Sequence, residues 1–420
     1  MNSNIILKRF GLNPNDFLEN DIEPITTDDG FIYLLEQNKN KIPCPYCHSN
    51  NIVLKEYYFR NINCSETIHI KDIFRIKVPR FKCKDCNKTF IKKLSNVNTH
   101  CNISNNVIKM ICNDFYMCKT FDEIAIKYHI SSAKVIDIFD NLIASPKRLT
   151  LPKILCIDEF HFSSSNNDNK YCVVIIDWEE KKVIDIIKNR KLPYLRDYFS
   201  KIDQKERNNV QYFVSDLYDG YRNIHNEFFK HSQHIADFYH ITLQLSRAVN
   251  SLRTQIMKQL DFSSLEYKFM KKHWQLFISR YNHKYDSKFF KTKNGIEIPF
   301  FDIFMKCIKL NDNLWNGYNC IQDLFSIRKD QYFSDAKKDF DWLINKLENS
   351  NSILLLDVAK TYKKWTIEIC NAYSYHIGFK NISNSIAECI NNQIKTLIKV
   401  AYGYNLFERF RKRILLLLRF

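Results

Sequence analysis

The sequence predicts an α/β domain, a mixed β-sheet with helices, interrupted by an all-helical insertion and preceded by two small modules. Three short apolar runs separated by polar, turn-prone stretches, at residues 154–160, 171–177 and 182–188, are typical of an antiparallel meander. The segment LPYLRDYFSKI then has the spacing of one helix face, and VQYFVSD ends another strand in a carboxylate. From Ile241 to about Asn381 the sequence is almost wholly helical. This order of strands, with acids at two strand ends, is typical of a ribonuclease H-like sheet.

At 420 residues the chain is too long for a typical single core. We therefore expect several domains along it, in this order: an N-terminal arm (1–40), a zinc ribbon (41–95), a helix-turn-helix DNA-binding region (96–148), the first part of a ribonuclease H-like catalytic domain (149–240), a helical insertion domain (241–381) and C-terminal helices of the catalytic domain (382–420).

Two Cys-x-x-Cys pairs, separated by strand-like sequence, predict the zinc ribbon. They consist of Cys44 and Cys47, and of Cys83 and Cys86. Four thiolates in this arrangement close a tetrahedral Zn²⁺ site that is structural, not catalytic. The 35 residues between the pairs predict an unusually long hairpin. Three nearby side chains are weaker alternatives as ligands: His48, Cys64 and His69. The alternatives are that the cysteines have this spacing by chance or that they form redox-active Cys-x-x-Cys motifs.

The region after the ribbon predicts a helix-turn-helix. Phe121, Ile124, Ala125 and Tyr128 form one apolar stripe, and Val135, Ile136 and Phe139 begin a second one. The Ser131-Ser132 pair between the stripes is a helix N-cap signal. The second helix of such a motif enters a DNA major groove, whereas the plain alternative is a helical hairpin that binds nothing.

Composition favours a nucleic-acid partner. The formal net charge is +17, and hydrophobic residues make up 45% of the chain, which supplies ample core material and excludes global disorder. The scattered single cysteines are typical of a reducing compartment. The longest apolar run is too short to span a bilayer, and the N-terminus lacks a signal peptide. We expect a cytoplasmic, nucleoid-associated protein without a membrane partner.

Three carboxylates are the predicted catalytic residues. Asp158 and Asp216 end neighbouring strands, and Glu388 lies on a late helix, on the face opposite an apolar stripe. Phosphoryl transfer by two Mg²⁺ (or Mn²⁺) ions needs converging oxygen ligands, one ion activating the nucleophile and the other stabilising the leaving oxygen. We expect Asp158 to bridge the ions. Each acid also has a non-catalytic interpretation. Asp158 is then a residue at a strand end, Asp216 belongs to a helix-initiating turn, and Glu388 forms a capping box with Ser385.

The order of these motifs resembles insertion-sequence transposases of the ISL-three type, which are DDE transposases. CPYC…CKDC, CIDEF, FVSDLYDGY, DFYH and SNSIAECINNQIKTLIKVAYGYNLFERFRKRIL carry the resemblance, which extends from Cys44 to Leu418. It implies that Asp158, Asp216 and Glu388 form the catalytic triad and that the four paired cysteines bind zinc. It also implies that Asp237 and His240, an Asp-x-x-His element, support the active site; the alternative for this histidine is a core position.

The resemblance implies an enzyme that binds terminal inverted repeats of double-stranded DNA, cleaves at the element ends and joins the 3′-hydroxyls to target DNA, with a homodimer expected on DNA. Basic or polar residues expected to contact DNA are Ser132, Lys134, Lys147, Arg148, Lys271, Lys272, Lys395, Lys399, Arg411 and Lys412. For any single lysine, a solvent-exposed position on a helix without a DNA contact is the simpler interpretation. No role is assigned to His161.

Two other functions fit the same sequence. One is a non-catalytic DNA-binding regulator derived from a transposase, and the other is a metal-dependent nuclease or resolvase that cuts without strand transfer.

Overall fold

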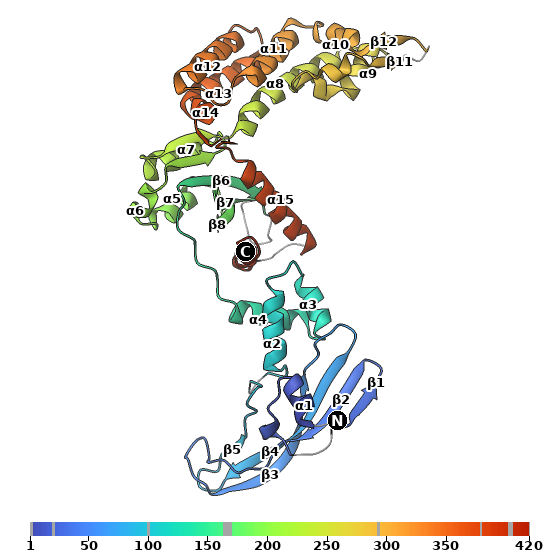
Figure 1. Ribbon diagram of the computed structural model, residues 1–420, viewed down its shortest axis with the longest axis vertical. Helices are drawn as coiled ribbons and strands as arrows, with labels where there is room; N and C mark the ends of the chain where they lie inside the picture. Colours follow the sequence, from blue (N-terminus) through green and yellow to red (C-terminus); the bar gives the residue numbers. More distant parts are fainter. Residues whose placement is uncertain are drawn as a thin grey trace. The chain divides into compact units, whose positions relative to one another are not determined.

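The computed structural model describes residues 3–18, 22–98, 101–162, 170–291, 295–378, 380–401 and 406–419 (Figure 1). The chain forms two compact units, residues 1–147 with 396–420, and residues 148–395. Two stretches used in the sequence analysis, the polar turn at 163–169 and the Tyr-Gly-Tyr at 402–404, lie outside the described residues. Within the described ranges, no helix combines the length and apolar character needed to cross a membrane.

A five-stranded sheet forms the base of the first unit. β3 and β4 are a long antiparallel pair, with Ile52 opposite Cys83, and β2 runs parallel to β4. This pair is the long hairpin expected between the two cysteine pairs. The strands, in sheet order, are β1 (Pro24–Thr27), β2 (Gly30–Glu36), β4 (Lys71–Cys83) and β3 (Ile52–Asn63), with β5 (Thr89–Ile91) paired to β4.

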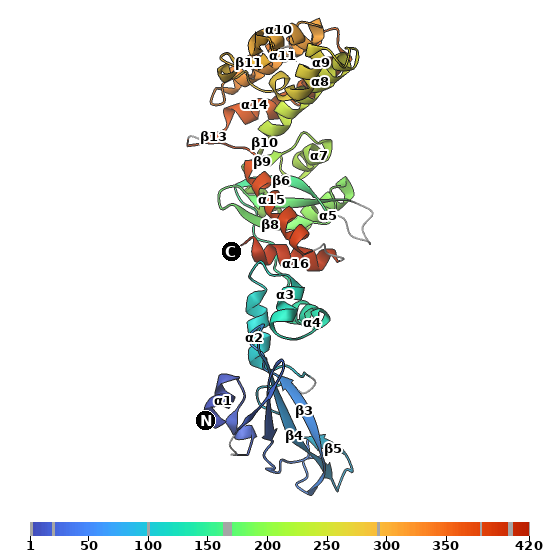
Figure 2. The same ribbon diagram turned by 90° about the vertical axis from the view of Figure 1, so that its right-hand side faces the viewer.

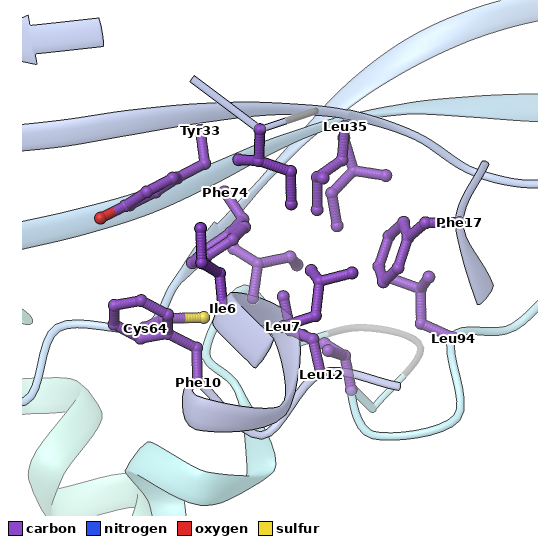
Figure 3. Close-up of a cluster of buried hydrophobic side chains, with 14 of the residues drawn as sticks. Ile6, Leu7, Phe10, Leu12, Phe17, Tyr33, Leu35, Cys64, Phe74 and Leu94 are labelled. Atoms are coloured by element: carbon purple, nitrogen blue, oxygen red, sulfur yellow. The ribbon is translucent and has the colours of Figure 1, made fainter. Parts of the chain in front are cut away.

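The N-terminal residues are folded onto this sheet. Helix α1 (Ser3–Arg9) and the turn after it place Ile6, Leu7 and Phe10 against the sheet (Figure 3). Tyr33 of β2 stacks on Phe74 of β4 with ring centres 4.5 Å apart. The described part of segment 1–40, expected as an arm, therefore shares a hydrophobic core with the hairpin, since eight of its hydrophobic side chains are buried there: Ile6, Leu7, Phe10, Leu12, Phe17, Ile22, Tyr33 and Leu35.

Three helices follow: α2 (Asn105–Asp114), α3 (Phe121–Lys127) and α4 (Ser132–Leu142). Thr120 and Glu123 form a capping box at the start of α3, and the Ser131 side chain accepts a hydrogen bond from the Lys134 N–H to cap α4. Most of the two apolar stripes lies in one core, where Tyr128 and Phe139 are fully buried. Ile136, expected in the second stripe, is not part of this core, and Ile138 takes its place because it lies on the same helix face as Val135. The two helices and the tight turn lie at the positions expected for a helix-turn-helix.

The C-terminal helix α16 (Phe407–Leu417) completes this helical core. Arg413 is 2% exposed and donates to the carbonyl oxygens of Phe115, Met117 and Lys119, in the turn between α2 and α3. Lys412 donates to the carbonyl oxygens of Phe139 (2.7 Å) and Asp140 (3.2 Å) at the end of α4. Through these backbone carbonyl groups, the two cations hold α16 to the turn after α2 and to the end of α4.

Two differences from the sequence analysis follow from α16. Residues 396–420 cluster with the first unit, whereas the sequence predicts that residues 382–420 belong to the catalytic domain. Lys412, expected to contact DNA phosphates, is 7% exposed and is bound to backbone carbonyls, so that expectation was wrong. An amphipathic pattern marks a helix but does not identify the surface against which it packs.

Replacing Arg413 by Ala should destabilise the helical module by about 3 kcal/mol, because three carbonyl oxygens lose a charged, buried donor. Amide hydrogen exchange in α3 and α4 of the full chain should then accelerate by on the order of 10²-fold. Arg411→Ala, on the same helix, is the control and should leave exchange close to wild type. Unchanged exchange in Arg413→Ala would show that α16 is only loosely attached.

The second unit contains a mixed sheet in the order β10-β9-β6-β7-β8. β6 to β8 form the predicted antiparallel meander, and β6, β9 and β10 are parallel. Helices α5 and α7 pack Leu195, Phe199, Tyr221 and Ile224 against the strands. The elements are β6 (Ile154–His161), β7 (Tyr171–Asp177), β8 (Lys182–Ile187), α5 (Leu192–Ser200), α6 (Gln204–Asn208), β9 (Tyr212–Ser215), α7 (Asp219–Phe228) and β10 (Gln233–Ala236).

A helical segment follows β10 and leads back to the sheet through α15 (Ser385–Val400), whose last residues belong to the first unit. Its members are α8 (Phe238–Lys258), α9 (Leu265–Lys272), α10 (Phe300–Ile308), α11 (Asp312–Ser326), α12 (Phe333–Glu348), α13 (Ile353–Lys364) and α14 (Thr366–Ser374). Figure 2 shows α8 to α11 gathered together beyond α14. Before α10, a small hairpin of β11 (Phe289–Lys291) and β12 (Glu297–Pro299) interrupts the helices. A second one pairs β13 (His376–Ile377) with β14 (Lys380–Asn381).

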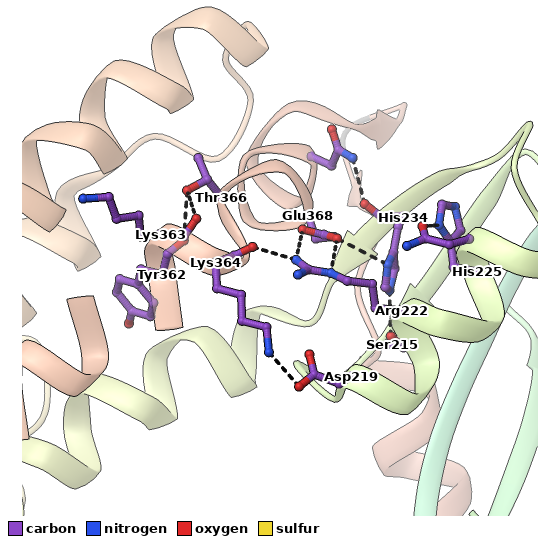
Figure 4. A network of polar contacts seen from close by, with 12 residues as sticks. Ser215, Asp219, Arg222, His225, His234, Tyr362, Lys363, Lys364, Thr366 and Glu368 are labelled. Atoms are coloured by element: carbon purple, nitrogen blue, oxygen red, sulfur yellow. Dashed lines mark hydrogen bonds and ion pairs between the residues drawn. The ribbon is translucent and has the colours of Figure 1, made fainter. Parts of the chain in front are cut away.

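A buried polar network attaches α14 to the sheet (Figure 4). Arg222 of α7 donates two hydrogen bonds to the Glu368 carboxylate (2.8 and 2.7 Å), and its guanidinium lies 3.7 Å from the centre of the Trp365 ring. His234 of β10 lies beside them, with Nε2 2.8 Å from the Ser215 hydroxyl. Burial lowers the pKa of His234 well below its usual value, so its imidazole is neutral. The network fixes the ends of β9 and β10.

Candidate active site

A cavity of about 790 Å³ opens at the carboxyl ends of β6, β9 and β10. Asp158, Asp216, Asp237, His240 and Glu388 all line it. The structure therefore brings the three predicted catalytic acids and both predicted supporting residues to one place in the second unit.

Strand register explains why the three aspartates are neighbours. In the parallel pairs, Cys156 of β6 lies beside Val214 of β9, and Ser215 lies beside Ala236 of β10. Extending these registers by one or two residues sets Asp158 beside Asp216, and Asp216 beside Asp237. Since parallel strands end at the same edge of a sheet, the carboxylates share that edge.

Asp158 is held by two hydrogen bonds. One oxygen accepts from the Glu159 N–H (2.8 Å), and the other accepts from the Asn391 side-chain amide (2.8 Å). Burial raises the pKa of Asp158 to about 7, and the nearby negative charges of Asp237 and Glu159 act in the same direction. The side chain is therefore oriented, but its negative charge lacks full compensation.

The Asp216 carboxylate has fewer hydrogen bonds than that of Asp158. Its Oδ1 is buried without a hydrogen-bond partner, and His240 Nε2 lies 3.2 Å away without hydrogen-bond geometry. Burial, together with the charges of Asp158 and Asp237, raises the pKa of Asp216 to about 9. The protein alone would keep this carboxyl protonated at neutral pH, whereas a bound cation would favour its ionised form.

Asp237 and His240 stand at the beginning of α8. Asp237 is 6% exposed, and its Oδ1 accepts a hydrogen bond from the Asn384 N–H (3.1 Å). Burial raises the pKa of Asp237 and lowers that of His240. Ligand atoms of Asp216, Asp237 and His240 all lie within 4.8 Å of one another, a spacing suited to a metal ion.

Glu388 reaches the cavity from the first turn of α15. Ser385 is the first helical residue, and in the described part of the chain the Glu388 carboxylate makes no hydrogen bond or ion pair. The structure thus contains no capping box between these two residues. An exposed carboxylate that faces other acids across a cavity is available to a cation.

Several cavity residues were missed by sequence reasoning. Asn391 bonds Asp158, and Arg190 donates to Glu159 (2.6 Å), whose other oxygen accepts from the Tyr221 hydroxyl (3.1 Å). For Asn391 a signal existed, because it stands three residues after Glu388 and so lies on the same helix face. Arg190 follows β8 with no comparable signal.

The four paired cysteines lie at one end of the β3–β4 hairpin, with their sulfur atoms within 4.8 Å of one another. Sγ of Cys44 is 3.6 Å from that of Cys86, and Sγ of Cys47 is 3.6 Å from that of Cys83. A tetrahedral zinc with Zn–S bonds of about 2.3 Å requires sulfur separations of roughly 3.7 Å, so the group fits the ion. Cys64, a weaker alternative, is buried in the core beneath α1.

Most residues expected to contact DNA from the helix-turn-helix already have protein partners. The Ser132 hydroxyl donates to Asp122, and Lys134 pairs with Asp137 at 2.7 Å. Arg148 makes a two-bond contact with Glu206 (2.5 and 2.9 Å) and is only a quarter exposed. We infer that Arg148 has a structural role, because its ion pair with Glu206 holds the beginning of the second unit in place.

Of the other residues expected at the DNA, Lys147, Lys395 and Lys399 are exposed and Arg411 is half-buried. Lys399 is exposed on α15, and Lys395 is exposed and lines the cavity. Arg411 lies 3.5 Å from the Ser145 hydroxyl, and the Lys147 carbonyl accepts from Arg419. His161, at the exposed end of β6, packs its ring edge-on against Tyr171.

Two comparisons with known proteins bear on this chain. A family model described as Transposase, for DDE enzymes of the ISL-three type, matches residues 155–414. The chain is also similar to a protein of Lactococcus lactis subsp. lactis named ATP-dependent protease, with 26% identity over 185 residues. That similarity covers 40% of this chain and 53% of the relative, so the chain spans about half of the relative's length.

Proposed function

The chain belongs to the ISL-three type of DDE transposases, and on this premise we propose that it recognises the terminal inverted repeats of an insertion sequence, cleaves DNA at the element ends and transfers the 3′-hydroxyls to target DNA. The observation that carries the proposal is the convergence of Asp158, Asp216 and Glu388 on one cavity, from two strands and a distant helix.

The fold supports this proposal. Three antiparallel strands (β6 to β8), helices α5 and α6, strand β9, helix α7 and strand β10 follow one another, which agrees with the order expected for a ribonuclease H-like domain. The helices between residues 241 and 381 interrupt that domain before Glu388, as the predicted insertion requires.

The three acids would hold two divalent cations, which supply activation of the nucleophile and stabilisation of the leaving oxygen when bound. Asn391 would orient Asp158, and the backbone N–H of Asn384 would orient Asp237. Lys395, at the same cavity, would attract a DNA phosphate. The buried Oδ1 of Asp216, which has no hydrogen-bond partner, supports the cation role, because hard cations prefer carboxylate oxygens.

Charge distribution indicates which module contacts the DNA backbone. Residues 41–95 contain 12 Lys and Arg against 4 Asp and Glu, whereas residues 96–148 contain 6 against 5. We propose that the ribbon, with a structural Zn²⁺ at its four cysteines, supplies most phosphate contacts. The helix-turn-helix would then contribute base readout.

Proteolysis, which the name of the Lactococcus relative raises, lacks structural support. Ser215, His234 and Glu368 do form a line, with His234 Nδ1 3.7 Å from the Glu368 carboxylate (Figure 4). Ser215 is fully buried in that line, so its hydroxyl has no access to a peptide.

A strand-transfer assay tests the proposed function. The purified chain, supplied with pre-cut ends of its element, a target duplex and Mg²⁺, should produce joined molecules. It should also cut uncut ends. Cutting without joining would indicate a nuclease or resolvase, and binding alone would indicate a regulator; either result would overturn the proposal.

A further inference from the structure

We propose that Asp216, Asp237 and His240 form a divalent-cation position with an imidazole ligand, which binds Mn²⁺ in preference to Mg²⁺. The inference rests on the proposed function, since it concerns the same cavity. It differs from the ligand set expected from the sequence, in which Asp158, Asp216 and Glu388 held both ions.

The grouping of donor atoms is the first argument. Of the carboxylates around the cavity, only Asp216 and Asp237 join His240 in a set whose donor atoms all lie within 4.8 Å, among the residues that the structure describes. Ligands of one ion at about 2.1 Å stand no more than roughly 4.3 Å apart, so a small side-chain rotation would close the set.

The second argument concerns hydrogen bonding. Asp216 Oδ1 is buried without a hydrogen-bond partner, yet it lies 3.2 Å from His240 Nε2, a nitrogen of an imidazole that makes no hydrogen bond elsewhere in the described residues. The His240 side chain is 32% exposed and lines the cavity, whereas Asp216 Oδ1 is buried, and a buried oxygen without a hydrogen bond is costly unless a ligand satisfies it. A cation between them would do so.

The third argument is rigidity. Asp237 precedes α8 and is tied to Asn384, while His240 follows in the first turn of the same helix. The backbone of Ser215 accepts the Asp237 N–H (3.0 Å), which fixes β10 to the end of β9. Asp216 and Asp237 are therefore held at adjacent strand ends before any ion binds.

Asp158 belongs to a different position. Both of its oxygens already accept hydrogen bonds, from Glu159 and Asn391, and neither it nor Glu388 joins the three-residue set. Asp158 and Glu388 therefore remain the ligands proposed for the other ion.

Ligand chemistry gives the metal preference. Mg²⁺ strongly prefers oxygen ligands, whereas imidazole nitrogen suits transition-metal ions, and Mn²⁺ accepts both. A position with two carboxylates and one imidazole should therefore select Mn²⁺ over Mg²⁺ and Ca²⁺.

Titration of the full chain with Mn²⁺ alone, followed by electron paramagnetic resonance of the free ion, tests this. His240→Ala should weaken binding at one Mn²⁺ site by at least about 10-fold, with Mg²⁺ binding changed little. His240→Asp restores an oxygen ligand, so Mg²⁺ binding should strengthen while the preference for Mn²⁺ is lost. Circular dichroism of both variants would verify folding.

His161→Ala is the matched control, because His161 lies outside the cavity lining at the exposed end of β6. Equal Mn²⁺ affinity in the wild type, His240→Ala and His240→Asp would overturn the inference. The readout is independent of the proposed function: absence of strand transfer would leave the Mn²⁺ titrations unaffected, and an unchanged titration would leave strand transfer intact.

Discussion

Replacing Asp158 by Asn is expected to reduce cleavage of element ends by at least about 10³-fold, equivalent to roughly 4 kcal/mol in the activation barrier. An amide has the shape of the carboxylate but lacks the negative charge that a cation requires. Asp158 also lies far in sequence from the ribbon, so the affinity for element ends should stay within about twofold of wild type. Single-turnover cleavage and a gel-shift titration measure the two quantities.

Asp177→Asn provides the matched control for this substitution. Asp177 also ends a strand of the same sheet, but its carboxylate accepts the N–H groups of Glu179 and Glu180 in a turn. Its replacement should leave cleavage unaltered. Cleavage by Asp158→Asn at the wild-type rate would remove this residue from the catalytic set and indicate that other acids hold the cations.

Replacing Cys83 by Ser is expected to release zinc and unfold the cysteine end of the ribbon. Structural zinc contributes on the order of 10 kcal/mol to such modules, and only a small core (Ile52, Phe81 and Phe90) surrounds the cysteines. Affinity for element ends should fall by on the order of 10²-fold, because the most basic segment loses its shape. Zinc content by atomic absorption and gel-shift titration would report both effects.

Cys118→Ser, an exposed cysteine outside the group of four, serves as the control for thiol loss. It should retain zinc and DNA affinity. Hydrogen exchange of β6 and β9 should be unchanged in both variants, since these strands belong to the other compact unit. Full zinc content in Cys83→Ser would show that the cysteine group is not the metal site.

Much of the local structure of this chain could be predicted from its sequence. Apolar runs that end in Asp158 and Asp216 predicted two strand ends; β9 does end at Ser215, directly before Asp216, whereas β6 continues past Asp158 to His161 because that part pairs with β7. The capped turn at Ser131 and the length of the β3–β4 hairpin were also readable, since N-caps and strand runs depend on neighbouring residues. The family resemblance is confirmed.

Long-range packing decided the rest. The parallel pairing of β9 and β10 brings Asp216 beside Asp237, and it places His240 Nε2 next to Asp216 Oδ1. Only the assembled cavity showed Asn391 bonded to Asp158, and only the packed core showed Arg413 bound to carbonyl groups almost 300 residues earlier. Sequence periodicity specifies which side of an element is apolar, but the partner of that side comes from contacts between distant segments. For this protein, the sequence alone determined the acids, the cysteines and the family, and tertiary structure decided which of those acids stand close enough to hold the same ion.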